Sequence, residues 1–228
     1  MIRKILLAML ILLIGGIVLV TKNEAAQCEK FEQTQEATKA IANVVSIPAD
    51  EVIEIEVEAE AETKEEAKEE AVTLEAPIAV DFNELPEDVE AWLYIPDIDI
   101  SYPIMSSGID YYYLSHDING NKDACGSICM DYRSVIGSSK LMVYGHNLSK
   151  GRGFGKLKSW ENPMDKEVWV IAKNGDAFKY CVDEIKTVDT AKDSSDYVIN
   201  EESNPDELIL ATCAGLHDST RLLVVCHK

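Results

Sequence analysis

Between residues 81 and 228 the chain consists of short apolar segments separated by turn-forming residues, and this pattern restricts the fold more than any other feature. Asn174 and Gly175 separate two of these segments, and this residue pair is favoured in two-residue hairpin turns. Helical patterns do not alternate with the segments, as a parallel sheet with crossover helices would require. Six to eight short strands with few helices therefore predict a mainly β fold, either a barrel or a sandwich. The expected strands cover 92–95, 127–130, 140–146, 167–172, 177–189, 207–213 and 220–228.

Short helices are expected at two places in this region. The stretch before the first strand predicts a helix with Asn83 as its N-cap and Pro86 early in it. Residues 153–160 predict a second short helix. Pro96 and Pro103 are expected to divide the following apolar stretch into short extended pieces, because proline cannot donate to a strand ladder.

The first twenty residues have the composition of a membrane-targeting segment. Residues 1–4 are a short basic region, and residues 5–20 form an apolar run that only two glycines interrupt. This run is longer than most signal-peptide cores and slightly shorter than a typical span, so both cleavage and retention are open. Because Ala25 and Ala26 offer only a weak cleavage site, we predict an uncleaved single-pass anchor with its N-terminus inside and the remainder of the chain outside.

Residues 21–78 are rich in Glu, Ala, Thr and Lys and almost free of aromatic side chains. Between residues 50 and 75 there are twelve acidic residues and two lysines, in a chain whose formal net charge is −20. Such a segment cannot bury a core, which predicts a flexible, solvated stalk ahead of a compact domain at 79–228. A recognition tail for a basic partner is the alternative. The acidic chain has no basic stripe, which argues against nucleic-acid binding.

The cysteine spacing does not predict a dense disulfide framework. Two of the cysteines fall inside expected strands, where a thiol behaves as a small apolar side chain. Two others lie four residues apart, so they either form a local bridge or stay unpaired in a reducing habitat. The strand cysteines are Cys181 and Cys226, and the closely spaced pair is Cys125 and Cys129.

Three residues at strand ends suggest a catalytic centre. Cys213 ends the expected strand "ELILATC", Arg221 begins the last strand, and His146 ends the strand "KLMVYGH". A cysteine provides a thiol nucleophile, a histidine carries protons near neutral pH, and an arginine binds a developing oxyanion. The three positions therefore predict a thiol enzyme.

The order of these motifs resembles the sortase family of cysteine transpeptidases, and class B sortases in particular. The resemblance covers residues 81–228 and rests on "YGHN" followed by "FGKLKSW", on "TC" at a strand end, and on the arginine that opens the final strand. The stretches 92–105 and 110–134 are similar to the region before the histidine in class B members. The resemblance implies an eight-stranded β-barrel with short N-terminal and connecting helices, anchored in the membrane of a Gram-positive cell and facing the cell wall.

The same resemblance implies a reaction, partners and roles for the residues. The enzyme would cut a sorting signal after threonine through a thioester and join the surface protein to an amine of a peptidoglycan precursor, a pilin or another protein, without a cofactor. Cys213 matches the nucleophile, His146 the general acid and base, and Arg221 the group that steadies the oxyanion or the substrate backbone. Further positions expected to contact substrate, or in the case of the asparagine to orient the histidine or a loop, are Asn147, Ala211, Thr212 and His217.

Two departures from the class B pattern bear on specificity. The segment reads "ILATC" where class B members usually have "TLSTC". The turn from Cys213 to Arg221 is also short, and about twenty residues lie between 188 and 207, where class B sortases typically carry a long insertion that contains a helix. A more open substrate groove is therefore expected.

Two other functions remain as alternatives. One is a membrane-tethered module that binds a metal ion through Cys125, Cys129, His116, Cys226 and His227, although one C-x3-C pair is weak evidence for zinc. The other is an inactive sortase-like scaffold, against which the intact cysteine, histidine and arginine argue. An L,D-transpeptidase fits poorly, because that class has its arginine two residues after the cysteine.

Overall fold

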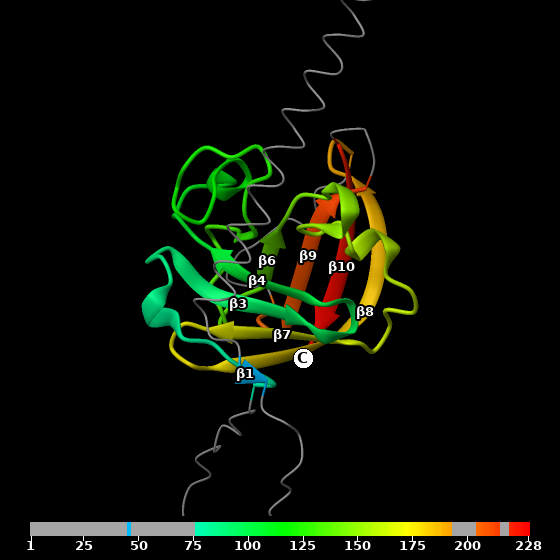
Figure 1. Cartoon of the computed structure of the whole chain (residues 1–228). Helices are drawn as coiled ribbons and strands as arrows, with labels where there is room; N and C mark the ends of the chain where they lie inside the picture. The colour runs from blue at the N-terminus through cyan, green and yellow to red at the C-terminus, as the bar shows by residue number, and fades with distance from the viewer. Residues whose placement is uncertain (1–44, 47–75, 193–203, 215–218) are drawn as a thin grey trace, which may run out of the picture.

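The computed structural model describes residues 45–46, 76–192, 204–214 and 219–228. Within these residues the chain forms a closed β-barrel in the neighbour order β10-β8-β7-β3-β4-β5-β6-β9 (Figure 1). Neighbouring strands are antiparallel except for the pairs β4–β5 and β6–β9, which are parallel. The barrel confirms the predicted mainly β fold. Its strands are β3 (Val89–Ile95), β4 (Ile100–Met105), β5 (Cys129–Met130), β6 (Leu141–Tyr144), β7 (Glu167–Ala172), β8 (Ala177–Asp189), β9 (Glu207–Cys213) and β10 (Thr220–His227).

The helices of the described residues are single 3-10 turns. The helix expected before the first strand is wrong, because only residues 82–84 are helical and the N-cap is Asp81 rather than Asn83. Leu85 stands before Pro86 and is extended, as the residue before a proline prefers, so the turn ends there. The second expected helix also shortens to one turn. The turns are η1 (Phe82–Glu84), η2 (Pro96–Ile98), η3 (Tyr112–Ser115), η4 (Ser149–Gly151) and η5 (Leu157–Ser159).

Two further strands lie outside the barrel. β1 (Val45–Ser46) pairs with β2 (Ile78–Ala79) in antiparallel register. Ile78 is buried and packs with Trp92 and Trp169 on the outer face of the barrel. The packed region therefore begins slightly before residue 79, and a short pairing occurs inside the segment expected to be a stalk.

β4 continues through Pro103, which was expected to break it. Pro103 lies opposite Trp92 in the β3–β4 pair. β4 pairs with β5 at its last residue, where Met105 lies opposite Cys129. Proline fits a strand that is paired along one edge only, so the strand tolerates it here. The strand expected over 127–130 is shorter than predicted, because β5 contains two residues.

Alternation along the strands divides the apolar side chains into an inner and an outer set. The inner set fills the barrel and includes Leu141, Val143, Leu208, Leu210 and Val224. The outer set lies on the opposite face of the same strands, where the segment between β4 and β5 covers it. Its members on the three strands that carry the site are Met142, Tyr144, Ile209, Ala211, Leu223 and Val225.

The expected membrane anchor at residues 5–20 lies outside the described residues. Among the described residues, no helix is long and apolar enough to span a bilayer.

Candidate functional site

Three neighbouring strands bring the predicted catalytic residues together. β9 lies between β6 and β10, with Tyr144 of β6 opposite Ala211 and with Arg221 of β10 opposite Cys213 (Figure 1). His146 follows β6 by two residues, and Gly145 between them still donates its N–H to the Ala211 carbonyl at 3.1 Å. Cys213 therefore lies in the middle, between the histidine and the arginine.

The strand period places all three side chains on one face of the sheet. Counting in steps of two, His146 follows Met142 and Tyr144, and Cys213 follows Ile209 and Ala211. Arg221 likewise precedes Leu223 and Val225 in the same phase. The residues from which they continue belong to the outer apolar set. The catalytic candidates thus lie on the outside of the barrel, beside the covering segment that joins β4 to β5.

Cys213 and Arg221 form a cross-strand pair in which the two side chains lie close together. The Ala214 N–H donates to the Thr220 carbonyl at 3.1 Å, and at the other end of the strands the Lys228 N–H donates to the Asp206 carbonyl at 3.1 Å. Hydrogen-bonded and non-hydrogen-bonded pairs alternate in an antiparallel ladder, which makes Cys213 and Arg221 a non-hydrogen-bonded pair. Side chains approach most closely in such pairs. The geometry sets a guanidinium beside the thiol.

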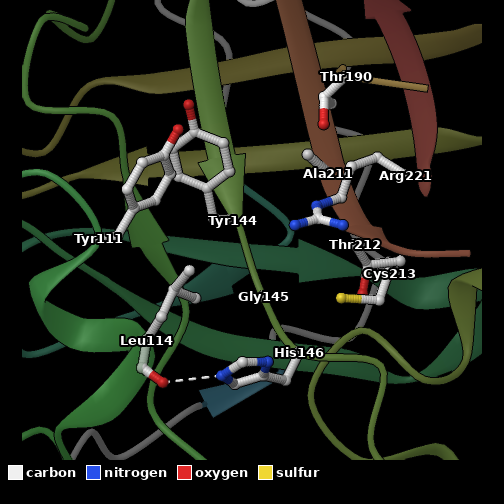
Figure 2. A pocket seen from close by; sticks show the side chains of 10 residues that line it. All are labelled: Tyr111, Leu114, Tyr144, Gly145, His146, Thr190, Ala211, Thr212, Cys213 and Arg221. Atoms are coloured by element: carbon white, nitrogen blue, oxygen red, sulfur yellow. Dashed lines mark hydrogen bonds between the residues drawn. The ribbon is translucent and has the colours of Figure 1, made fainter. Parts of the chain in front are cut away.

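The three side chains line one cavity of about 380 Å³ (Figure 2). Cys213 and Arg221 point into it from one side, and His146 closes its base. The rings of Tyr111 and Tyr144 form the facing wall, with their centroids 4.9 Å apart. The cavity thus combines a thiol, a guanidinium and an imidazole with an aromatic wall. Its remaining lining residues are Leu114, Gly145, Thr190, Ala211 and Thr212.

The backbone of η3 fixes the orientation of His146. Its Nε2 lies 2.7 Å from the carbonyl oxygen of Leu114. A carbonyl only accepts hydrogen bonds, so Nε2 carries a hydrogen and Nδ1 is the nitrogen that exchanges protons. Gly126 makes this arrangement possible, because a Cβ added there would lie 2.4 Å from the Leu114 oxygen and its φ is +58°.

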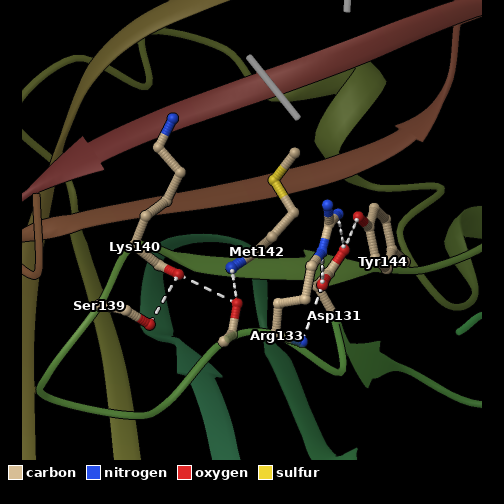
Figure 3. Close-up of polar contacts among 7 residues, drawn as sticks. Asp131, Arg133, Ser139, Lys140, Met142 and Tyr144 are labelled. Carbon is tan, nitrogen blue, oxygen red and sulfur yellow. Dashed lines mark hydrogen bonds and ion pairs between the residues drawn. The ribbon is translucent and has the colours of Figure 1, made fainter. Parts of the chain in front are cut away.

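A buried acid supports the aromatic wall. The Tyr144 hydroxyl donates to Asp131 at 2.7 Å, and Arg133 donates to both carboxylate oxygens of Asp131 at 2.8 Å (Figure 3). Burial by itself would raise the pKa of Asp131, but the hydrogen bonds from Arg133 and Tyr144 outweigh it, and the pKa lies below its ordinary value. Burial, together with this acid, raises the pKa of Tyr144. Tyr144 therefore stays neutral and keeps its ring in place.

Replacing Asp131 with asparagine is expected to destabilise the fold by about 2 to 3 kcal/mol at pH 7, because the change replaces the buried charged acceptor of the Arg133 and Tyr144 hydrogen bonds with a neutral amide. Because the pKa of Asp131 is lower in the folded state than in the unfolded chain, the carboxylate stabilises the fold at neutral pH. This stabilisation is lost as the pH falls below about 4. The variant should therefore lose less stability than the wild type on acidification. Urea unfolding at pH 7 and pH 3 measures both effects.

The control for this change is Asp99→Asn, whose carboxylate is 84% exposed in a pair with Lys156. That variant should unfold like the wild type, because exposed ion pairs contribute little. Equal stability of Asp131→Asn and the control would contradict the supporting role of Asp131.

The other predicted substrate contacts have different outcomes. Ala211 and Thr212 line the cavity. The Thr212 hydroxyl is buried and makes no hydrogen bond to a described residue. The Asn147 side chain binds the Cys213 carbonyl instead of pointing into the cavity, with a Nδ2–oxygen distance of 2.9 Å. His217 lies outside the described residues, as do positions 193–203 of the shortened connection.

The cysteines and histidines of the metal-binding alternative are spread over different surfaces. Cys125 and Cys129 are buried without a disulfide between them, and burial raises the pKa of Cys129 to about 12. Cys129 belongs to the outer apolar set, whereas Cys226 points into the barrel. His116 stacks on Tyr112 with a centroid distance of 3.9 Å. No group of three metal-ligating side chains forms among the described residues.

Several residues of the site are absent from the predictions made on sequence. Leu114 contributes through its carbonyl, which no side-chain pattern reveals. Tyr111 has a φ of 56°, which is uncommon for a residue with a side chain, and 46% of its surface is exposed at the cavity. Thr190 reaches the cavity from the end of β8. The run of three tyrosines at 111–113 was the only visible sequence signal.

Known proteins are similar to this chain in sequence and in fold. Residues 93–228 match the model of the Sortase domain. Over 92 residues the chain is 36% identical to Sortase B of Listeria monocytogenes, a match that spans 40% of this chain and 36% of that protein.

Solved structures show the same barrel. Sortase B of Staphylococcus aureus has a TM-score of 0.54 at 17% identity, covering 64% of this chain and 83% of that one. A class B sortase of Streptococcus pyogenes involved in pilus biogenesis has a TM-score of 0.53 at 21% identity, covering 61% and 91%. Sortase B of Clostridium perfringens has a TM-score of 0.51 at 21% identity, covering 61% and 93%. At these identities the likeness establishes the fold. The sortase model matches more than half of the sequence and includes all three catalytic candidates, and the chain therefore belongs to the sortase family.

Proposed function

We propose that this sortase is a cysteine transpeptidase that cleaves a sorting signal after threonine and transfers the surface protein to an amine. The observation that carries the proposal is the convergence of Cys213, His146 and Arg221 on one cavity at the outer face of three adjacent strands. A thiol beside a guanidinium and an imidazole has the parts that acyl transfer needs.

In the first half of the reaction, the Cys213 thiolate attacks the threonine carbonyl and forms a C–S bond. The guanidinium of Arg221, which lies across the ladder from Cys213, donates hydrogen bonds to the oxygen that becomes negative. His146 then gives a proton from Nδ1 to the nitrogen of the departing residue as the C–N bond breaks. A thioester on Cys213 and a free amine product result.

In the second half, an acceptor amine attacks the thioester carbonyl. Neutral His146 takes the proton from the attacking nitrogen, and Arg221 again stabilises the oxyanion. The C–S bond breaks, the thiolate returns, and the new amide leaves. The bond from His146 Nε2 to the Leu114 carbonyl persists throughout, so Nδ1 serves as acid in the first half and base in the second.

The cavity walls suggest how a peptide is held. Tyr111 and Tyr144 present an apolar wall opposite the Cys213 thiol. A peptide that lies between them exposes one carbonyl to Cys213 and packs a side chain on the rings. The acceptor is an amine of a peptidoglycan precursor, a pilin or another surface protein.

We place the enzyme at the outer face of the cell membrane. The apolar segment 5–20 supports a single-pass anchor, and the acidic segment 21–78 supports a spacer that carries the barrel toward the wall. Deleting residues 1–20 should move the protein from the membrane fraction to the soluble fraction. Fractionation of cells with an antibody to the barrel measures this, and retention of the deletion variant in the membrane would contradict the anchor.

The test of function uses the full chain in detergent with a panel of sorting-signal peptides that contain threonine, and with a small amine as acceptor. Intact-mass measurement should show a peptide acyl adduct on Cys213, which disappears as the amide product accumulates. Failure of every peptide to form an adduct, together with unchanged surface-protein attachment in cells whose Cys213 is replaced, would exclude the transpeptidase.

A further inference from the structure

Asn147 occupies the place where the hydrogen-bond ladder between β6 and β9 would continue. The Gly145 N–H donates to the Ala211 carbonyl at 3.1 Å. In a parallel ladder the next donor is two residues further on, and the next acceptor is the Cys213 carbonyl. The Asn147 side chain supplies that donor through Nδ2 at 2.9 Å. A side-chain amide thus takes the place of a backbone N–H in the rung at the nucleophile.

The backbone leaves the ladder at this point because it folds into a closed loop. The Phe154 N–H donates to the His146 carbonyl at 2.9 Å, and Asn147 forms a β-bridge with Gly153. Gly153 has a φ of +53°, and a Cβ there would lie 2.7 Å from the His146 oxygen. The main chain of residues 146 and 147 is therefore held by its own loop, and the Asn147 side chain crosses to β9.

The pairing register of β9 with β10 determines that the Cys213 carbonyl faces the Asn147 amide. Cys213 and Arg221 form a non-hydrogen-bonded pair, so the backbone groups of Cys213 point away from β10 and toward β6. Beyond Cys213 the chain enters its turn to β10. The Asn147 bond is the contact that ties the end of the nucleophile strand to the end of the histidine strand.

We propose that Asn147 is a positioning residue that sets the orientation of Cys213 relative to His146, an inference that rests on the proposed transpeptidase activity. Asn147 acts through the backbone of Cys213 and does not touch the reacting atoms. Loss of its amide should let the end of β9 shift by up to about 1 Å, and a displacement of this size lowers the rate of the chemical step.

The test compares Asn147→Leu, which keeps a similar shape and removes the donor without adding charge, with Asn147→Gln, which keeps an amide on a longer stem. The Leu variant should lose about 10- to 100-fold in kcat with KM nearly unchanged, and the Gln variant should recover part of the loss. Steady-state kinetics with the adduct-forming peptide gives both constants.

A second readout does not depend on peptide cleavage. The rate of Cys213 alkylation by iodoacetamide, measured against pH, reports the environment of the thiol when no substrate is known. The Leu variant should show an altered pH profile that the Gln variant partly restores. If no peptide reacts with the wild type, the proposed function fails, but this profile still tests the coupling of Asn147 to the thiol.

The matched control is Asn83→Leu. The exposed Asn83 amide of η1 also donates at 2.9 Å, to the N-cap residue Asp81, on another part of the barrel. This variant should keep the wild-type kcat and alkylation profile. The proposal is overturned if Asn147→Leu retains the wild-type kcat and profile, or if its losses follow a drop in thermal midpoint that Asn147→Gln shares to the same extent.

Discussion

Replacing Cys213 with alanine is expected to abolish thioester formation and to reduce peptide transfer by about 10⁴-fold or more, since none of the other described residues that line the cavity carries a thiol for the covalent intermediate that splits amide exchange into two steps. The fold should be unaffected, because Cys213 is half-buried at the end of β9 and alanine fits the same backbone. Intact-mass measurement and amide-product formation give the two losses.

The control for this substitution is Cys181→Ala. Cys181 is also half-buried and lies on β8, opposite His227 and away from the cavity. This variant should form the adduct at the wild-type rate. An adduct that persists in Cys213→Ala and disappears in Cys181→Ala would contradict the assignment of Cys213 as the nucleophile.

Replacing His146 with glutamine is expected to lower kcat by about 10²- to 10⁴-fold, the range that general acid and base catalysis contributes. Glutamine retains an N–H donor for the Leu114 carbonyl but cannot carry a proton between the two amines. The loss therefore isolates proton transfer from the structural role of the bond. Single-turnover kinetics with peptide alone and then with acceptor amine should show both half-reactions slowed.

His227→Gln controls for the loss of a histidine. His227 lies at the far end of β10, and its Nδ1 is 3.6 Å from a carboxylate oxygen of Asp183. This variant should keep the wild-type rate and pH profile. A His146→Gln enzyme that retained its rate and its dependence on pH would remove His146 from the mechanism.

Local sequence signals predicted the strands well because they are local in origin. Segments such as 141–144 and 207–213 are apolar and bounded by glycine or polar turn residues, and they formed strands nearly as expected. The helix before the first strand failed because Leu85 precedes Pro86 and prefers an extended backbone. Pro103 was misread as a strand break, since the sequence does not say which strand edge lacks a neighbour.

Part of the site could also be predicted from local sequence signals. Cys213, His146 and Arg221 were identified because chemically active residue types stand at the ends of apolar segments. The role of the Leu114 carbonyl was not predictable, because a backbone acceptor has no residue-type signature. Asn147 was expected to contact substrate or to orient the histidine or a loop, and its amide binds the Cys213 carbonyl.

The sequence by itself determined most of the barrel strands and, through their period of two, which side chains share a phase with the catalytic candidates. It did not determine that β6 and β10 flank β9, since β6 and β9 are parallel neighbours that lie far apart in the chain. Barrel closure decided that order, because it pairs β9 with β6 along one edge and with β10 along the other. The order and its register placed a guanidinium opposite the thiol and an asparagine amide on its carbonyl.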